Sequence, residues 1–311
     1  MTTHSVQFAI SIPQILSESR VNTGKLQAYL ARAEELGFHS AWVQEQILGR
    51  GGSCLEPISL LSYAAALTRR LRLGVAVLIT PLRSPAQLAK SLASLDQLSD
   101  GRLIAGVGIG ANTLVYPAFG ISAERRVRRF TEGLQLMKRL WTEERVTFDG
   151  EFWKLENASL EPKPVQKPHL PVWFGGGHPS ALKRAIELGN GWMGAGSSSS
   201  ESFKERVIQV RKFLAEANRD PATFPISKRV YLAIDSNKSR AIERLRQWSS
   251  RHYGNADLAD KVALWGDKQE IIAKLREVCA AGAEMILLNP VFDELEQMEL
   301  LAREIVPALR D

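Results

Sequence analysis

Residues 71–110 constrain the fold more than any other stretch of this chain. An alternating β-branched run covers 73–79 and stops at a proline, a helical pattern covers 84–98, and a second apolar run covers 103–107 after an Asp-Gly turn. A strand, a helix and a strand of these lengths pack only as two parallel neighbours joined by a right-handed crossover. The glycines at 106, 108 and 110 therefore lie where α/β folds bind their ligands.

The rest of the chain repeats this alternation. We count about eight strand and helix pairs, the number that closes a barrel, whereas a doubly wound sheet usually stops at about five to seven strands. No GxGxxG or P-loop motif opens a nucleotide-binding unit. We therefore predict a (β/α)8 TIM barrel in a single domain, residues 1–311. The other expected strands are 6–12, 40–43, 172–174, 191–194, 229–234 and 285–289, and the other expected helices include 24–36, 56–68, 122–141, 179–188, 203–217, a helix through Trp248, and 268–281.

Composition excludes several classes of protein. The net charge of +6 comes with no nucleic-acid-binding motif, and no apolar run approaches the roughly 20 residues that span a bilayer. The start of the chain has no basic region followed by an apolar one, so we expect a cytoplasmic protein. Two cysteines are too few for a disulfide framework, and neither they nor the five histidines show metal-ligand spacing. We expect no metal.

Glu45 and Gln46 directly follow the short strand 40–43, so they should point into the mouth of a barrel. Glu45 could orient a substrate or transfer a proton, whereas Gln46 can donate a hydrogen bond but cannot titrate. The alternative for Glu45 is a salt bridge to an arginine at the mouth such as Arg83. The glycine-rich loop 47–53 is expected to be mobile.

A second candidate site is the run Gly175-Gly176-Gly177, which leads into a helix with Pro179 in its first turn. Free backbone N–H groups and the positive end of the helix dipole would meet there, and both favour a phosphate. A lone glycine triplet is weak evidence, however, because it also occurs in tight turns.

Four arginines lie in the first turns of the predicted helix 122–141, for which Ser122 is the expected N-cap. Cations at a helix N-terminus oppose the macrodipole and need compensation. One source of this compensation is Glu124, Glu132 and water, and the other is an anionic ligand. An irregular loop, 111–121, precedes this helix, and a hairpin pairing 146–148 with 152–155 should follow it. The arginines are Arg125, Arg126, Arg128 and Arg129.

Several segments carry a family resemblance. They include ARAEELGFHSAWVQEQ, PLRSPAQLAK…LDQLSDGRLIAGVGIG, RRFTEGLQLMKRLWTEERVTFDGEFW and PVWFGGGHPSALKRAIELGNGWM. With the closing AGAEMILLNP they span most of the chain, and the second segment is highly specific. The sequence is similar to the bacterial luciferase-like superfamily of flavin- and deazaflavin-dependent oxidoreductases. Its members have a modified (β/α)8 barrel that holds reduced FMN or the deazaflavin coenzyme F-420 at the C-terminal mouth.

The resemblance also implies positions for the cofactor. A bulge in the third strand falls at Ala76-Val77, often with a non-prolyl cis peptide behind the flavin ring. Many members carry a histidine near the end of the second strand, where this chain has Glu45-Gln46, so a general base at this place is in doubt. The ring and ribityl chain would lie along Gly108, Ile109, Gly110 and Asn112, and the phosphate on Gly176, Gly177 and His178.

Two cofactors and one non-catalytic alternative remain open. Reduced FMN would make the chain the oxygenase of a two-component system, whereas reduced F-420 transfers hydride. The excess of arginine slightly favours F-420, whose tail is polyanionic. The alternative is a flavin-binding or partner subunit without catalysis. We further expect a homodimer that acts on a small molecule, has a separate flavin or F-420 reductase as a candidate partner, and binds neither nucleic acid nor membrane.

Overall fold

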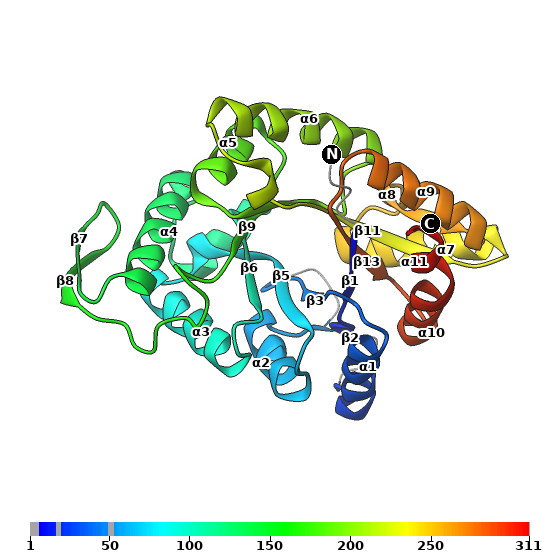
Figure 1. The fold of residues 1–311 in the computed structure, drawn as a ribbon, viewed down its shortest axis with the longest axis horizontal. Helices are drawn as coiled ribbons and strands as arrows, with labels where there is room; N and C mark the ends of the chain where they lie inside the picture. The colour runs from blue at the N-terminus through cyan, green and yellow to red at the C-terminus, as the bar shows by residue number, and fades with distance from the viewer. Residues whose placement is uncertain (1–5, 17–19, 49–52, 311) are drawn as a thin grey trace.

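The computed structural model describes residues 6–16, 20–48 and 53–310. A nine-stranded sheet forms its centre, and eight of those strands close a parallel barrel because β13 pairs with β1 and β11 while β10 pairs with β11. Figure 1 shows the helices arranged around it. The predicted TIM barrel is confirmed. Its strands are β1 (Gln7–Ser11), β3 (Ser40–Val43), β5 (Arg72–Ile79), β6 (Leu103–Gly108), β9 (Val172–Phe174), β10 (Gly191–Gly194), β11 (Ile226–Ile234) and β13 (Met285–Pro290).

Local signals set the bounds of most helices. Ser84 caps the helix after β5 by accepting a hydrogen bond from the Gln87 N–H, and Pro85 occupies its first turn. Asp267 and Glu270 form a reciprocal capping box. The helices are α1 (Thr23–Glu35), α2 (Pro57–Leu67), α3 (Pro85–Leu98), α4 (Arg126–Thr142), α5 (Pro179–Leu188), α6 (Ser200–Glu216), α9 (Lys268–Ala280) and α10 (Glu294–Leu300), the last continued by a π-helical segment (Leu301–Ile305) and α11 (Val306–Ala308).

The core of the barrel has two main parts because side chains alternate along each barrel strand, and a small third cluster lies between β11 and the helices that follow it. The outward-facing residues join the helices in one large apolar cluster. The inward-facing residues form a second cluster inside the barrel, in which Trp42 and Trp173 lie with ring centroids 5.5 Å apart. This inner cluster comprises Ala9, Trp42, Ile104, Trp173, Met193, Met285 and Leu287, with Ala76 packed against it.

The structure also contains elements that the sequence patterns did not predict. A two-stranded sheet joins β2 (Ile15–Leu16) to β4 (Ser53–Cys54). An insertion between β11 and α9 contains α7 (Lys238–Tyr253), which is the helix expected through Trp248, and the unpredicted α8 (Leu258–Val262) and β12 (Leu264–Gly266). β12 pairs with the carboxyl end of β11. Short 3₁₀ turns cover 80–82 and 221–223. No helix in the described ranges is long and apolar enough to cross a bilayer.

Two boundaries around α4 differ from the prediction. The expected irregular loop 111–121 contains a 3₁₀ helix (Thr113–Phe119), because the Asn112 side chain accepts the Leu114 N–H and starts a turn. Ser122 is not the N-cap of α4. Its hydroxyl accepts the Glu124 N–H instead, and the helix begins at Arg126 after a further turn.

The predicted hairpin is present as β7 (Val146–Asp149) and β8 (Lys154–Ala158), with Phe148 opposite Leu155. It projects away from the barrel at the left of Figure 1. Its second strand starts later than expected because the N–H groups of Phe152 and Trp153 bond to the Glu132 carboxylate and not to the opposite strand.

Candidate active site

The barrel mouth has two halves with different chemistry. The ends of β5, β6 and β9 are lined by glycines and by the Ala76-Val77 bulge, whereas the ends of β3, β11 and β13 carry polar side chains. β11 and β13 lie across the closed barrel from β5 and β6, whereas β3 is the neighbour of β5. A flat ligand could therefore rest on the first half with its reactive face toward the second.

The bulge predicted for the third barrel strand is present. The pairing of β5 with β6 shifts register between Val75 and Leu78, and the Ala76–Val77 peptide is cis. Val77 then occupies the space under the ends of β6 and β9, because a Cβ on Gly108 would lie 2.7 Å from Val77 Cγ2 and one on Gly175 would lie 3.1 Å from Val77 Cγ1. Glycine is required at Gly108 for this packing, whatever binds above it.

The next residues of the same loop have local roles as well. Gly110 has φ +72°, and the Ile109 carbonyl accepts a hydrogen bond from the Tyr116 hydroxyl at 2.6 Å. Asn112 is exposed, and its side-chain oxygen caps the 3₁₀ helix. The backbone of 108–110 thus borders the mouth, while the Asn112 oxygen is already engaged.

The glycine triplet forms a loop with unused backbone donors. Within the described part of the chain, the N–H groups of Gly176, Gly177 and His178 donate no backbone hydrogen bond. The carbonyl oxygens of the two glycines hold the loop in place, since Trp192 Nε1 donates to Gly176 O at 2.7 Å and Arg206 Nε donates to Gly177 O at 3.0 Å. His178 is the N-cap of α5, where its ring nitrogen accepts the Ser180 N–H. Unused N–H groups at a helix N-terminus can bind an anion.

Two basic side chains, Arg206 beside this loop and Lys228 near Arg206, were not among the residues singled out from the sequence. Arg206 comes from α6 and forms no ion pair with a described carboxylate. Lys228 comes from β11, is 2% exposed, and its ammonium donates to the carbonyls of Ala195 and Ser198. Burial, and then the charge of Arg206, lowers the Lys228 pKa to about 7. Both lie far along the chain from the glycines, so no local motif could identify them.

Glu45 is held by two partners. Its side chain is fully buried, forms an ion pair with Arg83 and accepts the Ile79 N–H. The salt-bridge alternative is therefore confirmed. Burial raises the Glu45 pKa, and the Arg83 cation and the Ile79 N–H oppose that rise. Gln46 is half-buried, and its side chain forms no hydrogen bond with the described residues. Of the loop 47–53, residues 49–52 lie outside the described ranges.

The α4 arginines are compensated differently from the prediction. Arg125 and Arg128 form ion pairs with Glu151 in the hairpin, and not with Glu124 or Glu132. Arg129 lies over the Trp153 ring at 4.5 Å and donates to the Pro81 carbonyl. Glu132 accepts from hairpin N–H groups instead. Together with Arg83, Phe119 and Phe152, Arg125 and Arg129 line a cleft of ≈ 540 Å³.

In the polar half, Arg229 is bound by two neutral side chains. Its Nε donates to Asn289 Oδ1 at 2.9 Å and its Nη2 to Gln44 Oε1 at 2.6 Å. Both cysteines are free thiols, and no group of metal-ligating side chains occurs among the described residues. The mouth therefore provides hydrogen-bond donors, cations and a glycine-lined wall. Among the described residues, it has no nucleophile beside a base.

An α/β barrel with these features at the carboxyl ends of its strands defines an enzyme of the kind that works through a bound organic cofactor. The chain belongs to the luciferase-like monooxygenase family, whose family model matches residues 6–285, and it is an oxidoreductase of that family.

Known proteins resemble the chain over nearly its whole length. It is 29% identical to the F420-dependent glucose-6-phosphate dehydrogenase of Kineococcus radiotolerans, over 92% of this chain and 93% of the relative. Among solved structures it is 26% identical to monooxygenase RslO1 from Streptomyces bottropensis, with a TM-score of 0.80 over 97% and 99% of the two chains. An F420-dependent secondary alcohol dehydrogenase in complex with an F420-acetone adduct shares the fold, with a TM-score of 0.85 over 99% and 100% at 22% identity.

Proposed function

We propose that this chain uses coenzyme F-420 to transfer hydride to or from a small organic substrate. The observation that carries the proposal is the loop 176–178, where free N–H groups lie beside Arg206, a cation with no carboxylate partner among the described residues. An anion is the ligand that satisfies both. The full-length similarity to an F420-dependent dehydrogenase supports the deazaflavin over FMN.

The residues present fit such a cofactor. Gly176, Gly177 and His178 would hold the phosphate, with Arg206 beside it. Ala76, Val77 and Gly108 would form the wall against the ring, and the backbone of Ile109 and Gly110 would border it. Asn112 would act through its backbone, because its side-chain oxygen caps the 3₁₀ helix. The bound deazaflavin would supply the hydride, and the barrel would hold its ring facing the polar half of the mouth.

Glu45 and Gln46 have different parts in this proposal. Glu45 fixes the turn after β5 through Arg83 and the Ile79 N–H, so it positions the wall of the cofactor site. Gln46 has a side-chain amide that is still available, and it can donate a hydrogen bond to substrate or cofactor. Neither residue is proposed to abstract a proton.

A titration with each cofactor tests the proposal. Purified protein is titrated with F-420 and with FMN by fluorescence, and the reduced cofactors are then compared for oxygen consumption in its presence. We expect F-420 to bind more tightly than FMN, without protein-dependent consumption of oxygen. Binding of FMN alone, with oxygen consumed, would establish the monooxygenase alternative, and binding of neither would favour the non-catalytic one.

The homodimer, the cytoplasmic location and the separate reductase stay predictions. The assembly state is measured by light scattering on the purified chain. The need for a reductase is measured by activity with chemically reduced cofactor, which makes a protein partner unnecessary if the substrate still turns over.

A further inference from the structure

Arg229 points into the barrel mouth. It pairs in register with Leu287, an inward-facing residue, and neighbouring strands present paired residues on the same face. Gln44 follows the inward-facing Trp42 by two residues, and Asn289 follows Leu287 by two. The three side chains therefore converge from β11, β13 and the end of β3, and β11 and β13 lie across the barrel from β5 and β6.

The surroundings of Arg229 are neutral. Its hydrogen-bond acceptors are two amide oxygens, and no described carboxylate forms an ion pair with it. Burial, with a smaller effect of the Arg229 charge, lowers the His252 pKa to about 4, so this imidazole is uncharged at neutral pH. Burial raises the pKa values of Tyr253 and Cys54, which keeps both protonated. A cation partly removed from water among neutral groups lacks the counter-ion that it needs.

Gln44 supplies a second unsatisfied donor. The residue is 7% exposed, and its Nε2 has no hydrogen-bond partner among the described residues. The Cys54 thiol is close to this side chain, and its sulfur is only a weak acceptor. Gln14 fixes the Gln44 backbone from both sides, donating to its carbonyl and accepting from its N–H, each at 2.8 Å. The amide is therefore held in place with its nitrogen unused.

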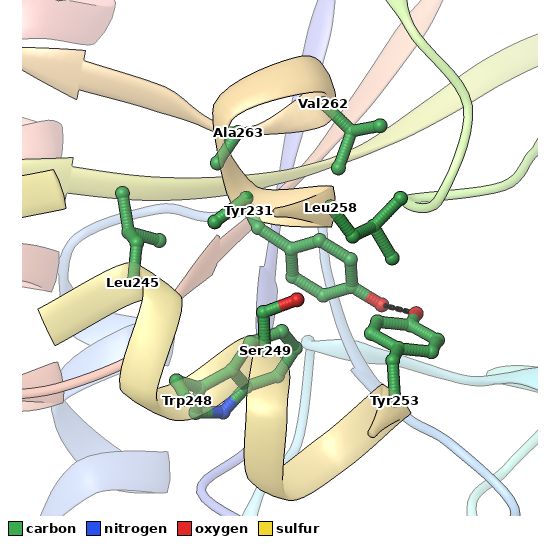
Figure 2. Close-up of a pocket in the computed structure, with 9 residues that line it drawn as sticks. Tyr231, Leu245, Trp248, Ser249, Tyr253, Leu258, Val262 and Ala263 are labelled. Atoms are coloured by element: carbon green, nitrogen blue, oxygen red, sulfur yellow. Dashed lines mark hydrogen bonds between the residues drawn. The ribbon is translucent and has the colours of Figure 1, made fainter. Parts of the chain in front are cut away.

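Aromatic side chains from the insertion close this side of the mouth. Tyr231 is on the same face of β11 as Arg229, whose guanidinium lies 5.0 Å from the ring centroid. Figure 2 shows Tyr231 reaching from β11 to Tyr253 of α7, with their hydroxyls hydrogen-bonded and Trp248 beside them. These aromatic side chains limit the space around the cation.

We propose that Arg229 and Gln44 bind an oxyanion of the substrate, a carboxylate or a phosphate, opposite the cofactor wall. The inference rests on the proposed function for the cofactor and names the substrate class: a small organic acid or phosphate ester. Arg229 provides charge and its remaining N–H groups, and Gln44 Nε2 provides a neutral donor. Asn289 positions the guanidinium through its side-chain oxygen.

Calorimetric titration with inorganic phosphate and with acetate, at constant ionic strength, tests the site without substrate or cofactor. We expect wild-type protein to bind two anions per chain, one at the loop 176–178 and one at Arg229, and Arg229→Gln to bind the second at least ~10-fold more weakly. Preference for phosphate indicates a phosphate ester, and preference for acetate indicates a carboxylate. Arg246→Gln is the matched control, because it removes an exposed arginine of α7 that pairs with Asp260, and it should bind like wild type.

Gln44→Glu is a second variant that tests the same site if Arg229→Gln does not fold. A carboxylate at this position pairs with Arg229 within the protein, so it should abolish binding of the second anion while the thermal midpoint is kept. Binding of both anions with wild-type affinity in either variant overturns the proposal. So does a parallel loss of F-420 affinity in Gln44→Glu, because the cation would then serve the cofactor. If the wild type binds anions but not F-420, the proposed cofactor fails and the anion site stands.

Discussion

Val77 and Gly108 fit together so closely that the second must be a glycine. A Cβ on Gly108 would lie 2.7 Å from Val77 Cγ2, nearer than van der Waals contact allows. Val77 reaches this position because the bulge after Val75 shifts its strand against β6. The wall of the proposed cofactor site is therefore a packed unit of two strand ends.

Gly108→Ala should destabilise the protein by about 1–3 kcal/mol through overpacking against Val77 and should weaken cofactor binding. Adding Val77→Ala should recover part of the stability, because it removes the methyl groups that collide. Urea unfolding of the two single variants and the double variant gives the coupling energy. Additive effects would show that the two side chains do not compete for this space.

Arg206→Met should weaken F-420 binding by ~10-fold or more, because it removes the charge beside the phosphate loop while keeping the length of the side chain. Lys212→Met, an exposed position on the same helix, is the control and should bind normally. Gly177→Asp should have a stronger effect, since its carboxylate would lie against Arg206 and occupy the anion site. Unchanged F-420 and FMN titrations in Gly177→Asp would disprove this placement.

Arg83→Met should destabilise the protein by about 3–5 kcal/mol at neutral pH, because it leaves the buried Glu45 carboxylate without its cation. The loss of Arg83 also raises the Glu45 pKa further, so the destabilisation should shrink as the pH falls and the carboxyl takes up a proton. Urea unfolding at pH 7 and pH 5 measures this trend. The same loss of unfolding free energy at both pH values would contradict this prediction. Adding Glu45→Gln to Arg83→Met should restore stability at neutral pH.

His252 should make stability depend on pH above the range where carboxylates titrate. Its pKa is about 4 in the folded chain and about 6.5 in the unfolded chain, so the unfolded state binds more protons between these values. Stability should therefore fall as pH drops from 6.5 toward 4, by at most about 3 kcal/mol for this residue. His39 acts in the same direction. Urea midpoints at pH 7.5, 6.5 and 5.5 should change less in His252→Asn than in wild type.

Much of the barrel could be predicted from the sequence because its signals are local. The strands 40–43, 172–174 and 191–194 have the predicted bounds, since short apolar runs between turn residues define them. The start of α5 after the glycine triplet was predicted in the same way, from a proline in its first turn, and anion binding there stays a prediction. The bulge at Ala76-Val77 was predicted from the family resemblance.

Long-range packing decided the rest. Glu45 is neutralised by Arg83, 38 residues away, and Arg229 meets Gln44 across 185 residues, so no pattern along the chain contains either contact. The start of α4 and the bounds of the hairpin depended on which N–H groups Ser122 and Glu132 accept. Periodicity determines which face of a strand is buried, whereas only the closure of the barrel determines which polar side chains meet at its mouth.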